Sequence, residues 1–235
     1  MIRVLAPEPL ADGSRLVTLD DAESHHLRVR RATAGDGAEV LDGLGRIGVG
    51  RLVLQGKGWQ VELDSVRVVP EPADLVLLVG AGDKDRFGWL VEKAVELGVT
   101  RLVPLDTERS RHVGSRVRDE HRGRFTERAA EALKQCGGAW RLRIETVTPI
   151  EPALDSVSAG ARWLADPAGL EPRGLQPDEP VAVVIGPEGG LTPAESDLAR
   201  TSGFVPTTLG GRILRFETAA IAAATMAGLG RKERR

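Results

Sequence analysis

The feature that most constrains the fold is the alternation, after residue 74, of short unbroken apolar runs with stretches of helical periodicity. Apolar runs at 75–79, 101–105 and 181–185 each have the length of one strand, and they do not alternate between apolar and polar residues. Strands buried on both faces have this pattern, because helices cover a parallel sheet from each side. We therefore predict an α/β fold with a parallel sheet. Further strands are predicted at 162–165 and 204–209, and helices at 87–97, 122–135 and 218–229.

The start of one more helix is marked by three residues. Thr192 is a suitable N-cap, Pro193 occupies the first helical position, and Glu195 follows the cap by three residues. This combination forms a capping box, in which two side chains bind the first N–H groups of the helix. A helix is therefore predicted to begin at Pro193.

The first seventy residues have a different character. Short strand-like segments at 15–19, 38–42, 47–54 and 59–63 are separated by glycines and Asp-Gly steps. A small β-barrel would close such strands without exposed edges. Prolines in the stretch 70–74 favour an extended linker, so we predict two domains, 1–70 and 71–235.

Composition excludes several classes of protein. Of the 235 residues, 41% are hydrophobic and 28% are charged, which is typical of a globular chain. No apolar run approaches the roughly 20 residues that span a bilayer, and the N-terminus lacks a signal-peptide core, so we expect a cytoplasmic protein without membrane contact. The single Cys136 and four scattered histidines give no metal-ligand spacing, and no metal is expected.

Charge is distributed unevenly along the chain. The net charge is −2, yet residues 101–143 contain eleven Lys and Arg against six Asp and Glu. Such a basic segment can bind nucleic-acid phosphates locally, because charges act over about 10 Å at 0.1 M salt. A solvated helix face is the alternative, and composition alone does not separate the two.

Two glycine-rich loops follow predicted strands, at 186–191 and 209–215. Ligands of open α/β sheets bind at the carboxyl ends of strands, where these loops lie. The first loop does not suit a phosphate, because Pro187 lacks an N–H donor and Glu188 adds negative charge. A neutral or cationic ligand fits better, and a simple tight turn is the alternative.

Four motifs in order along the chain carry a family resemblance. They are His25 to Arg31 with Gly35 and Asp36; Lys84 to Arg86 with 92–99, Pro104 and 108–110; Gly186 to Gly190 with Thr192 and Glu195; and Leu209, Gly210, 212–215 and 217–220. Together they are similar to the motifs of RsmE-type 16S rRNA (uracil-N3)-methyltransferases of the SPOUT superfamily.

The resemblance carries expectations for the whole chain. It implies a PUA-like RNA-binding β-barrel over 1–70, a SPOUT methyltransferase domain with a trefoil knot over 71–235, and a homodimer. It implies S-adenosyl-L-methionine as the cofactor, without a metal, and a uridine N3 of 16S rRNA in the small ribosomal subunit as the target.

The resemblance also assigns roles to residues. Arg215 is the expected catalytic residue, because a permanent cation can stabilise the developing uracil anion; an ion pair with Glu217 or Glu188 is the alternative. The general base stays open between those two glutamates. Cofactor contacts are expected from Ile185, Gly186, Pro187, Glu188, Gly189, Leu209, Gly210, Ile213, Leu214, Thr218 and Ala219, with Ile185, Leu209, Ile213 and Leu214 forming an apolar slot. RNA contacts are expected from His26, Arg28, Arg30, Arg31, Lys84, Arg86, Arg109 and Arg111.

Some positions depart from the family pattern or stay ambiguous. Gly211 and Phe216 replace a usual Pro and Thr, and the segment 135–140 lacks a usual Arg, for which Arg141 or Arg143 could substitute. The alanines of 218–229 suit close helix packing, either within the chain or in a dimer, and the resemblance favours the dimer. The rival functions are a ribose 2′-O-methyltransferase of the same superfamily and a non-catalytic RNA-binding factor.

Overall fold

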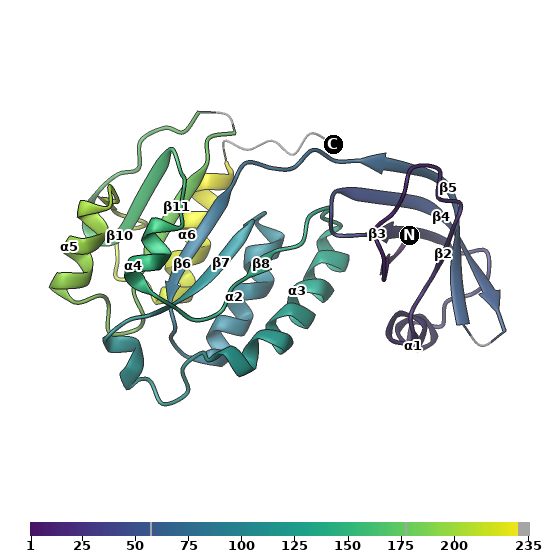
Figure 1. The fold of residues 1–235 in the computed structure, drawn as a ribbon, viewed down its shortest axis with the longest axis horizontal. Coiled ribbons are helices and arrows are strands. Elements are labelled where there is room, and N and C mark those ends of the chain that lie inside the picture. Colours follow the sequence, from purple (N-terminus) through teal and green to yellow (C-terminus); the bar gives the residue numbers. More distant parts are fainter. Residues whose placement is uncertain (57, 177, 230–235) are drawn as a thin grey trace. The chain divides into compact units, whose positions relative to one another are not determined.

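The computed structural model describes residues 1–229 with the exception of 57 and 177. The chain forms two compact units (Figure 1). Unit 1 contains Met1–Glu71 and Ala130–Arg141, and unit 2 contains Pro72–Ala129 and the described chain from Leu142 onward. Helix α3 (Arg122–Cys136) therefore contributes its first half to unit 2 and its second half to unit 1.

Unit 1 is built on a five-stranded sheet. Its order is β1-β3-β4-β5-β2, with β1 parallel to β3 and the other pairs antiparallel. The predicted strands of this region are all present. Their bounds are β1 (Ile2–Leu5), β2 (Leu16–Thr18), β3 (Gly37–Leu41), β4 (Arg46–Gln55) and β5 (Gly58–Val68).

Two elements of unit 1 were not predicted, β1 and helix α1 (Asp21–Val29). The helix begins after Asp20, whose carboxylate accepts the backbone N–H of Glu23. Apolar periodicity could not indicate this helix, because its buried residues are Glu23, Ser24 and Leu27, and two of these are polar. Leu27 joins the core formed by alternate residues of the strands, including Val40 and Val61.

Unit 2 confirms the α/β prediction with a seven-stranded sheet. The order is β12-β10-β11-β6-β7-β8, β9 also pairs with β7, and every pairing is parallel. The strands are β6 (Leu75–Gly80), β7 (Arg101–Asp106), β8 (Arg143–Ile144), β9 (Thr148–Pro149), β10 (Ala161–Leu170), β11 (Val181–Ile185) and β12 (Val205–Thr207).

Helices cover both faces of this sheet (Figure 1). On one face, α4 (Ile150–Asp155) and α5 (Pro193–Thr201) pack on a cluster that includes Val76, Leu78 and Val184. On the other face, α6 (Phe216–Gly228) contacts α2 (Lys84–Glu96), β6 and β11. The short α4, β8 and β9 were not predicted, because runs of two to six residues carry too little periodicity.

The alanines of α6 pack within the chain. Ala219, Ala220, Ala223, Ala224 and Ala227 are all buried in the single chain. Their small side chains let α6 approach the sheet and α2 closely. These five alanines therefore form intramolecular contacts, and the dimer interpretation of the helix stays a prediction.

Candidate functional site

The loops after β6 and β11 meet at the carboxyl ends of these neighbouring strands. A Cβ on Gly80 would lie 2.4 Å from the backbone nitrogen of Pro187, and a Cβ on Gly82 would lie 2.6 Å from Oε2 of Glu188. A side chain at Gly80 would therefore displace the 186–191 loop, and one at Gly82 would displace the Glu188 carboxylate. The loop itself turns sharply, with Gly190 at φ +73° and its N–H donated to the carbonyl of Pro187 at 2.7 Å.

The Glu188 carboxylate accepts a hydrogen bond from the chain's own backbone. Its Oε1 accepts the N–H of Asp83 at 2.9 Å. Asp83 in turn caps α2 by accepting the N–H groups of Asp85 and Arg86. The pKa of Asp83 is lowered, first by the hydroxyl of Ser115 and then by the backbone N–H of Arg86. Glu188 thus fixes the loop that starts α2.

The segment after β7 reaches the same loop. Arg109 donates from Nη1 to the carbonyl of Gly189 at 2.6 Å. Glu195 accepts the N–H of Glu108 through Oε1 and the N–H of Thr192 through Oε2, both at 2.8 Å. The predicted capping box of α5 is thereby confirmed, and it has the further task of holding the β7 segment. Arg109 lies against the glycine-rich loop and supports it.

The second glycine-rich loop joins β12 to α6. Thr208 donates its N–H to the carbonyl of Leu170 at 2.9 Å, and it donates its hydroxyl to the carbonyl of Gly210 at 3.1 Å. The four residues of the expected apolar slot differ in exposure: Ile185 is buried, Leu209 and Leu214 are half-buried, and Ile213 is 88% exposed. Within this one chain, Ile213 therefore contributes nothing to an enclosed slot.

Arg215 is exposed at the N-cap position of α6. The ion pair that the sequence left open, to Glu217 or Glu188, is not formed among the described residues. Glu217 instead faces Arg86, with 3.9 Å between Oε1 and Nη1. The Glu217 side chain is only 9% exposed, and its Oε2 has no hydrogen-bond partner in the described chain.

The remaining basic residues predicted in unit 2 differ in the ion pairs that their side chains form. Arg111 pairs with Asp106 at 2.9 Å, and Arg116 lies 3.3 Å from the same carboxylate. The pKa of Asp106 is lowered, mainly by its hydrogen bond from Arg111. Lys84 and Arg86 lie in the first turn of α2. Two of the expected cofactor contacts, Thr218 and Ala219, lie in the first turn of α6.

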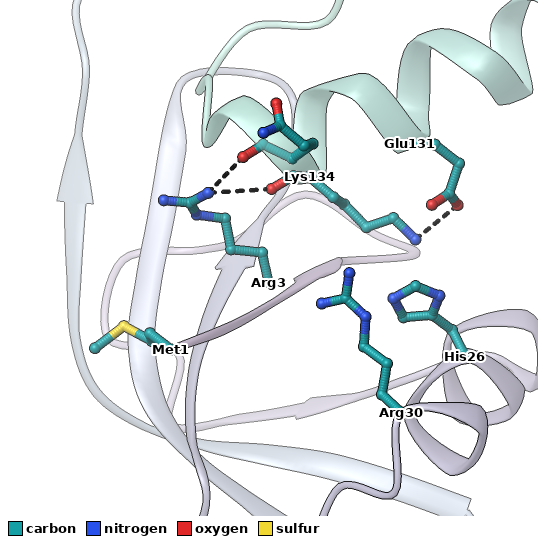
Figure 2. Close-up of a pocket in the computed structure, with 7 residues that line it drawn as sticks. Met1, Arg3, His26, Arg30, Glu131 and Lys134 are labelled. Carbon is teal, nitrogen blue, oxygen red and sulfur yellow. Dashed lines mark hydrogen bonds and ion pairs between the residues drawn. The ribbon is translucent and has the colours of Figure 1, made fainter.

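The basic residues predicted in unit 1 gather at the C-terminal end of α1. His26 and Arg28 lie in its last turn, Arg30 is the C-cap, and Arg31 follows in the left-handed region at φ +56°. His26 and Arg30 line a pocket of about 260 Å³ together with residues of β1 and α3 (Figure 2). The other lining residues are Met1, Arg3, Glu131, Lys134 and Gln135.

Sequence reasoning missed the role of Lys134. Its ammonium lies 2.7 Å from Glu23 and 2.8 Å from Glu131, and its side chain is 7% exposed. Burial lowers the pKa of Lys134, but hydrogen bonds to Glu131 and Glu23 outweigh it, so the net shift is upward. A lysine in an amphipathic helix gives no signal of this pairing, because Glu23 is more than a hundred residues away in the sequence.

The described residues contain no group of three or more His, Cys, Asp or Glu side chains placed to hold a metal ion. They also contain no helix with the length and apolarity needed to cross a membrane.

The fold and the site define a class. Unit 2 is a parallel α/β domain with interlocked glycine-rich loops at the carboxyl ends of its strands, which is where such domains bind nucleotide-like ligands. Basic residues surround these loops and also gather on the small β unit. These are the features of an enzyme that acts on nucleic acid.

Comparison with known proteins identifies the family. Residues 69–228 match the model of the RNA methyltransferase domain, and residues 19–62 match that of the RNA methyltransferase PUA domain. The chain therefore belongs to this RNA methyltransferase family, as its motifs predicted.

Named relatives and solved structures agree. A Synechocystis protein named ribosomal RNA small subunit methyltransferase E is 33% identical over 92% of this chain and 73% of its own length. The crystal structure of the Neisseria gonorrhoeae protein of that name, bound to S-adenosyl methionine, is 29% identical with a TM-score of 0.84, over 95% of both chains. A Legionella pneumophila methyltransferase structure with bound cofactor SAM is 25% identical with a TM-score of 0.84, over 98% of both chains.

Proposed function

We propose that this protein transfers a methyl group from S-adenosyl-L-methionine to N3 of a uridine in 16S rRNA of the small ribosomal subunit. One observation carries the proposal: the loops after β6, β7 and β11 interlock around Gly186 to Gly190, at the end of the sheet where this class binds its ligand. Membership of the RNA methyltransferase family and the likeness to structures with bound cofactor support it.

The residues of this site suit the cofactor. A Cβ on Gly186 would meet the backbone of Gly190 at 2.8 Å, so this part of the loop presents backbone in place of side chains. Peptide N–H and C=O groups can recognise an adenine edge, and a cationic sulfonium is compatible with the nearby Glu188. We assign cofactor contacts to Ile185, Gly186, Pro187, Glu188, Gly189, Leu209, Gly210, Ile213, Leu214, Thr218 and Ala219.

The bound cofactor supplies an electrophilic methyl group, so the protein's own task is to position the uridine and stabilise charge. We assign that task to Arg215. Its guanidinium is exposed and without an ion-pair partner in the described chain, so its donors are available to a uracil oxygen or to the adjacent phosphate. Glu188 is held by the N–H of Asp83, and Oε2 of Glu217 is buried, so the structure assigns neither as the base.

We propose the domain roles that the family resemblance implies. Residues 1–70 would form a PUA-like RNA-binding barrel, and 71–235 a SPOUT domain with a trefoil knot. The connection between β12 and α6 is the segment that this proposal assigns to the knot. β12 is at the sheet edge beside β10, yet α6 packs on β11 and β6, so residues 208–215 cross the carboxyl ends of the intervening strands.

Partners and location follow from the same proposal. RNA contacts are assigned to His26, Arg28, Arg30, Arg31, Lys84, Arg86, Arg109 and Arg111. We also propose a homodimer in which the exposed Ile213 is covered by the second copy, and a cytoplasmic location, where ribosomal subunits are assembled.

The test is methyl transfer from radiolabelled S-adenosyl-L-methionine to purified 30S subunits that lack the modification, followed by nucleoside analysis. Label in 3-methyluridine is expected. An Arg215→Ala variant should retain cofactor binding while its rate falls at least about 100-fold, the size of loss seen when one transition-state donor is removed. Label on a ribose, or none despite bound cofactor, would overturn the proposal.

A further inference from the structure

The pocket between α1 and the second half of α3, which lies entirely in unit 1, is lined mainly by the cations Arg3, Arg30 and Lys134 together with the imidazole of His26. Arg3, His26, Arg30 and Lys134 contribute nitrogen donors, and Glu131 is the one carboxylate of the lining (Figure 2). Glu131 is already paired with Lys134 at 2.8 Å. The lining therefore offers many more donors than acceptors.

Two of these cations hold the walls together. Arg3 donates from Nε to Glu39 at 2.8 Å and from Nη1 to the carbonyl of Gln135 at 2.7 Å. Lys134 is balanced by Glu23 and Glu131. The carbonyls at the C-terminal end of a helix carry partial negative charge, which repels an anion. Arg3 donates to two such carbonyls of α3 and so reduces this repulsion.

The unusual glycine at 137 makes this arrangement possible. A Cβ on Gly137 would lie 2.8 Å from Cζ of Arg3, and the residue has φ +77°. The C-terminal end of α3 is thus covered by the guanidinium of Arg3 from β1. Of the two predicted substitutes, Arg141 packs against Gly43, and Arg143 pairs with Asp74.

Among the described residues, the third cation, Arg30, and the imidazole of His26 are free of such contacts. Within the described chain, the side chains of Arg30 and His26 have no hydrogen-bond or ion-pair partner, and both point into the pocket (Figure 2). Arg28 and Arg31 are exposed at the same end of α1. An arginine with all its donors available beside a second donor suits a phosphate, which accepts several hydrogen bonds in a fork geometry.

We infer that this pocket binds a backbone phosphate of the RNA substrate, with Arg30 and His26 as its direct ligands and the ion-paired Arg3 and Lys134 forming the wall beside them. The inference rests on the proposed function and deepens it, because it adds α3 and β1 to the RNA-binding surface. A phosphate contact fixes the orientation of the RNA without reading its sequence.

The test measures binding of the full-length protein to purified 30S subunits over a series of KCl concentrations. Arg30→Ala is expected to weaken binding about tenfold at 0.1 M salt and to reduce the slope of log affinity against log salt by about one. Arg30→Lys, which keeps the charge, should recover most of the slope. Arg67→Ala removes another exposed arginine of unit 1 and should change affinity less than twofold.

A variant that is expected to strengthen RNA binding makes the test sharper. Glu131→Gln removes the carboxylate of the pocket while Lys134 keeps Glu23, so binding should become two- to threefold tighter. The pocket assignment is overturned if Arg30→Ala binds like the wild type, or if Arg30→Ala and Arg67→Ala lose affinity equally. Formation of 3-methyluridine by the wild type is measured in parallel. Its failure would count against the proposed function itself, whereas success with an unaffected Arg30→Ala variant would count against the pocket alone.

Discussion

Gly80, at the end of β6, shows how strongly a single atom can constrain the cofactor loop. An added Cβ would lie 2.4 Å from the nitrogen of Pro187, and a backbone atom cannot swing aside as a side chain can. Gly80→Ala should therefore lower the free energy of unfolding by about 1–3 kcal/mol, as overpacking usually does. It should also weaken cofactor binding at least about tenfold, because the loop is displaced.

Urea unfolding and calorimetric titration with S-adenosyl-L-methionine measure the two effects. Gly114→Ala is the matched control, since an added Cβ there has nothing within 4 Å and the residue does not need a positive φ. The control should stay within about 0.5 kcal/mol of the wild type. Equal behaviour of the two variants would show that the loop contact is not constraining.

Asp83 makes a pH-dependent contribution at the start of α2. Its pKa is below the ordinary value of 3.8, because the hydroxyl of Ser115 and the N–H of Arg86 favour the charged form. The resulting stabilisation is fully present above pH 3.8 and is lost as the pH falls through the lower pKa of the folded state. The wild type should therefore exceed Asp83→Asn in stability at neutral pH, and this difference should shrink in acid.

Thermal unfolding of both proteins between pH 7 and pH 2.5 checks the sign. Asp64→Asn, at an exposed carboxylate of unit 1, should give a difference from the wild type that hardly changes over the same range. A constant difference for Asp83→Asn would contradict the proposed role of its charge.

At the scale of elements, Glu195 belongs to a helix cap and to a link between loops at once. One of its oxygens accepts the N–H of Thr192 in the same cap. The other accepts the N–H of Glu108, which lies 87 residues earlier in the sequence. Glu195→Ala should cost about 1–2 kcal/mol of unfolding free energy, and Thr192→Ala about 1 kcal/mol. Because the two residues share one network, the double variant should lose less than the sum.

Denaturant unfolding of the two single variants and the double variant forms a complete cycle. Thr201→Ala, at the other end of α5, is a suitable control, because its hydroxyl bonds only within its own helix. Strict additivity of the Thr192 and Glu195 effects would show that the capping box and the loop link act independently.

Sequence patterns predicted those elements whose signals are local. The capping box at Thr192 and the strands of buried apolar runs are set by residues within one element, so periodicity and caps reveal them. The helix α1 was missed because its buried face includes Glu23, whose Oε1 pairs with Lys134 of α3. Similarly, nothing local indicates that Glu188 and Arg109 support the loop backbone, since Asp83 and Gly189 belong to other segments of the chain.

At the scale of the whole chain, the fold class could be predicted because covering a parallel sheet on both faces forces apolar runs onto its strands. The extent of the compact units could not. Residues 130–141 belong to unit 1 through Lys134, the bonds of Arg3 and the indole of Trp140, which donates to the carbonyls of Val69 and Pro70. Such contacts join segments far apart in the sequence, and a linear pattern carries no record of them.

The proposed homodimer gives the prediction that belongs to the assembled molecule. Ile213 is 88% exposed in a loop that we assign to the cofactor site, and large apolar side chains at functional loops commonly become buried on association. Covering an isoleucine contributes about 1.5–3 kcal/mol, so Ile213→Asp should raise the dimer dissociation constant at least about tenfold. Sedimentation velocity over a concentration series measures this shift. Leu54→Asp changes another exposed apolar residue, in unit 1, and should leave the distribution unchanged. A wild type that remains monomeric at every concentration would remove the dimer from the proposal, and it would leave Ile213 available to the RNA or the cofactor alone.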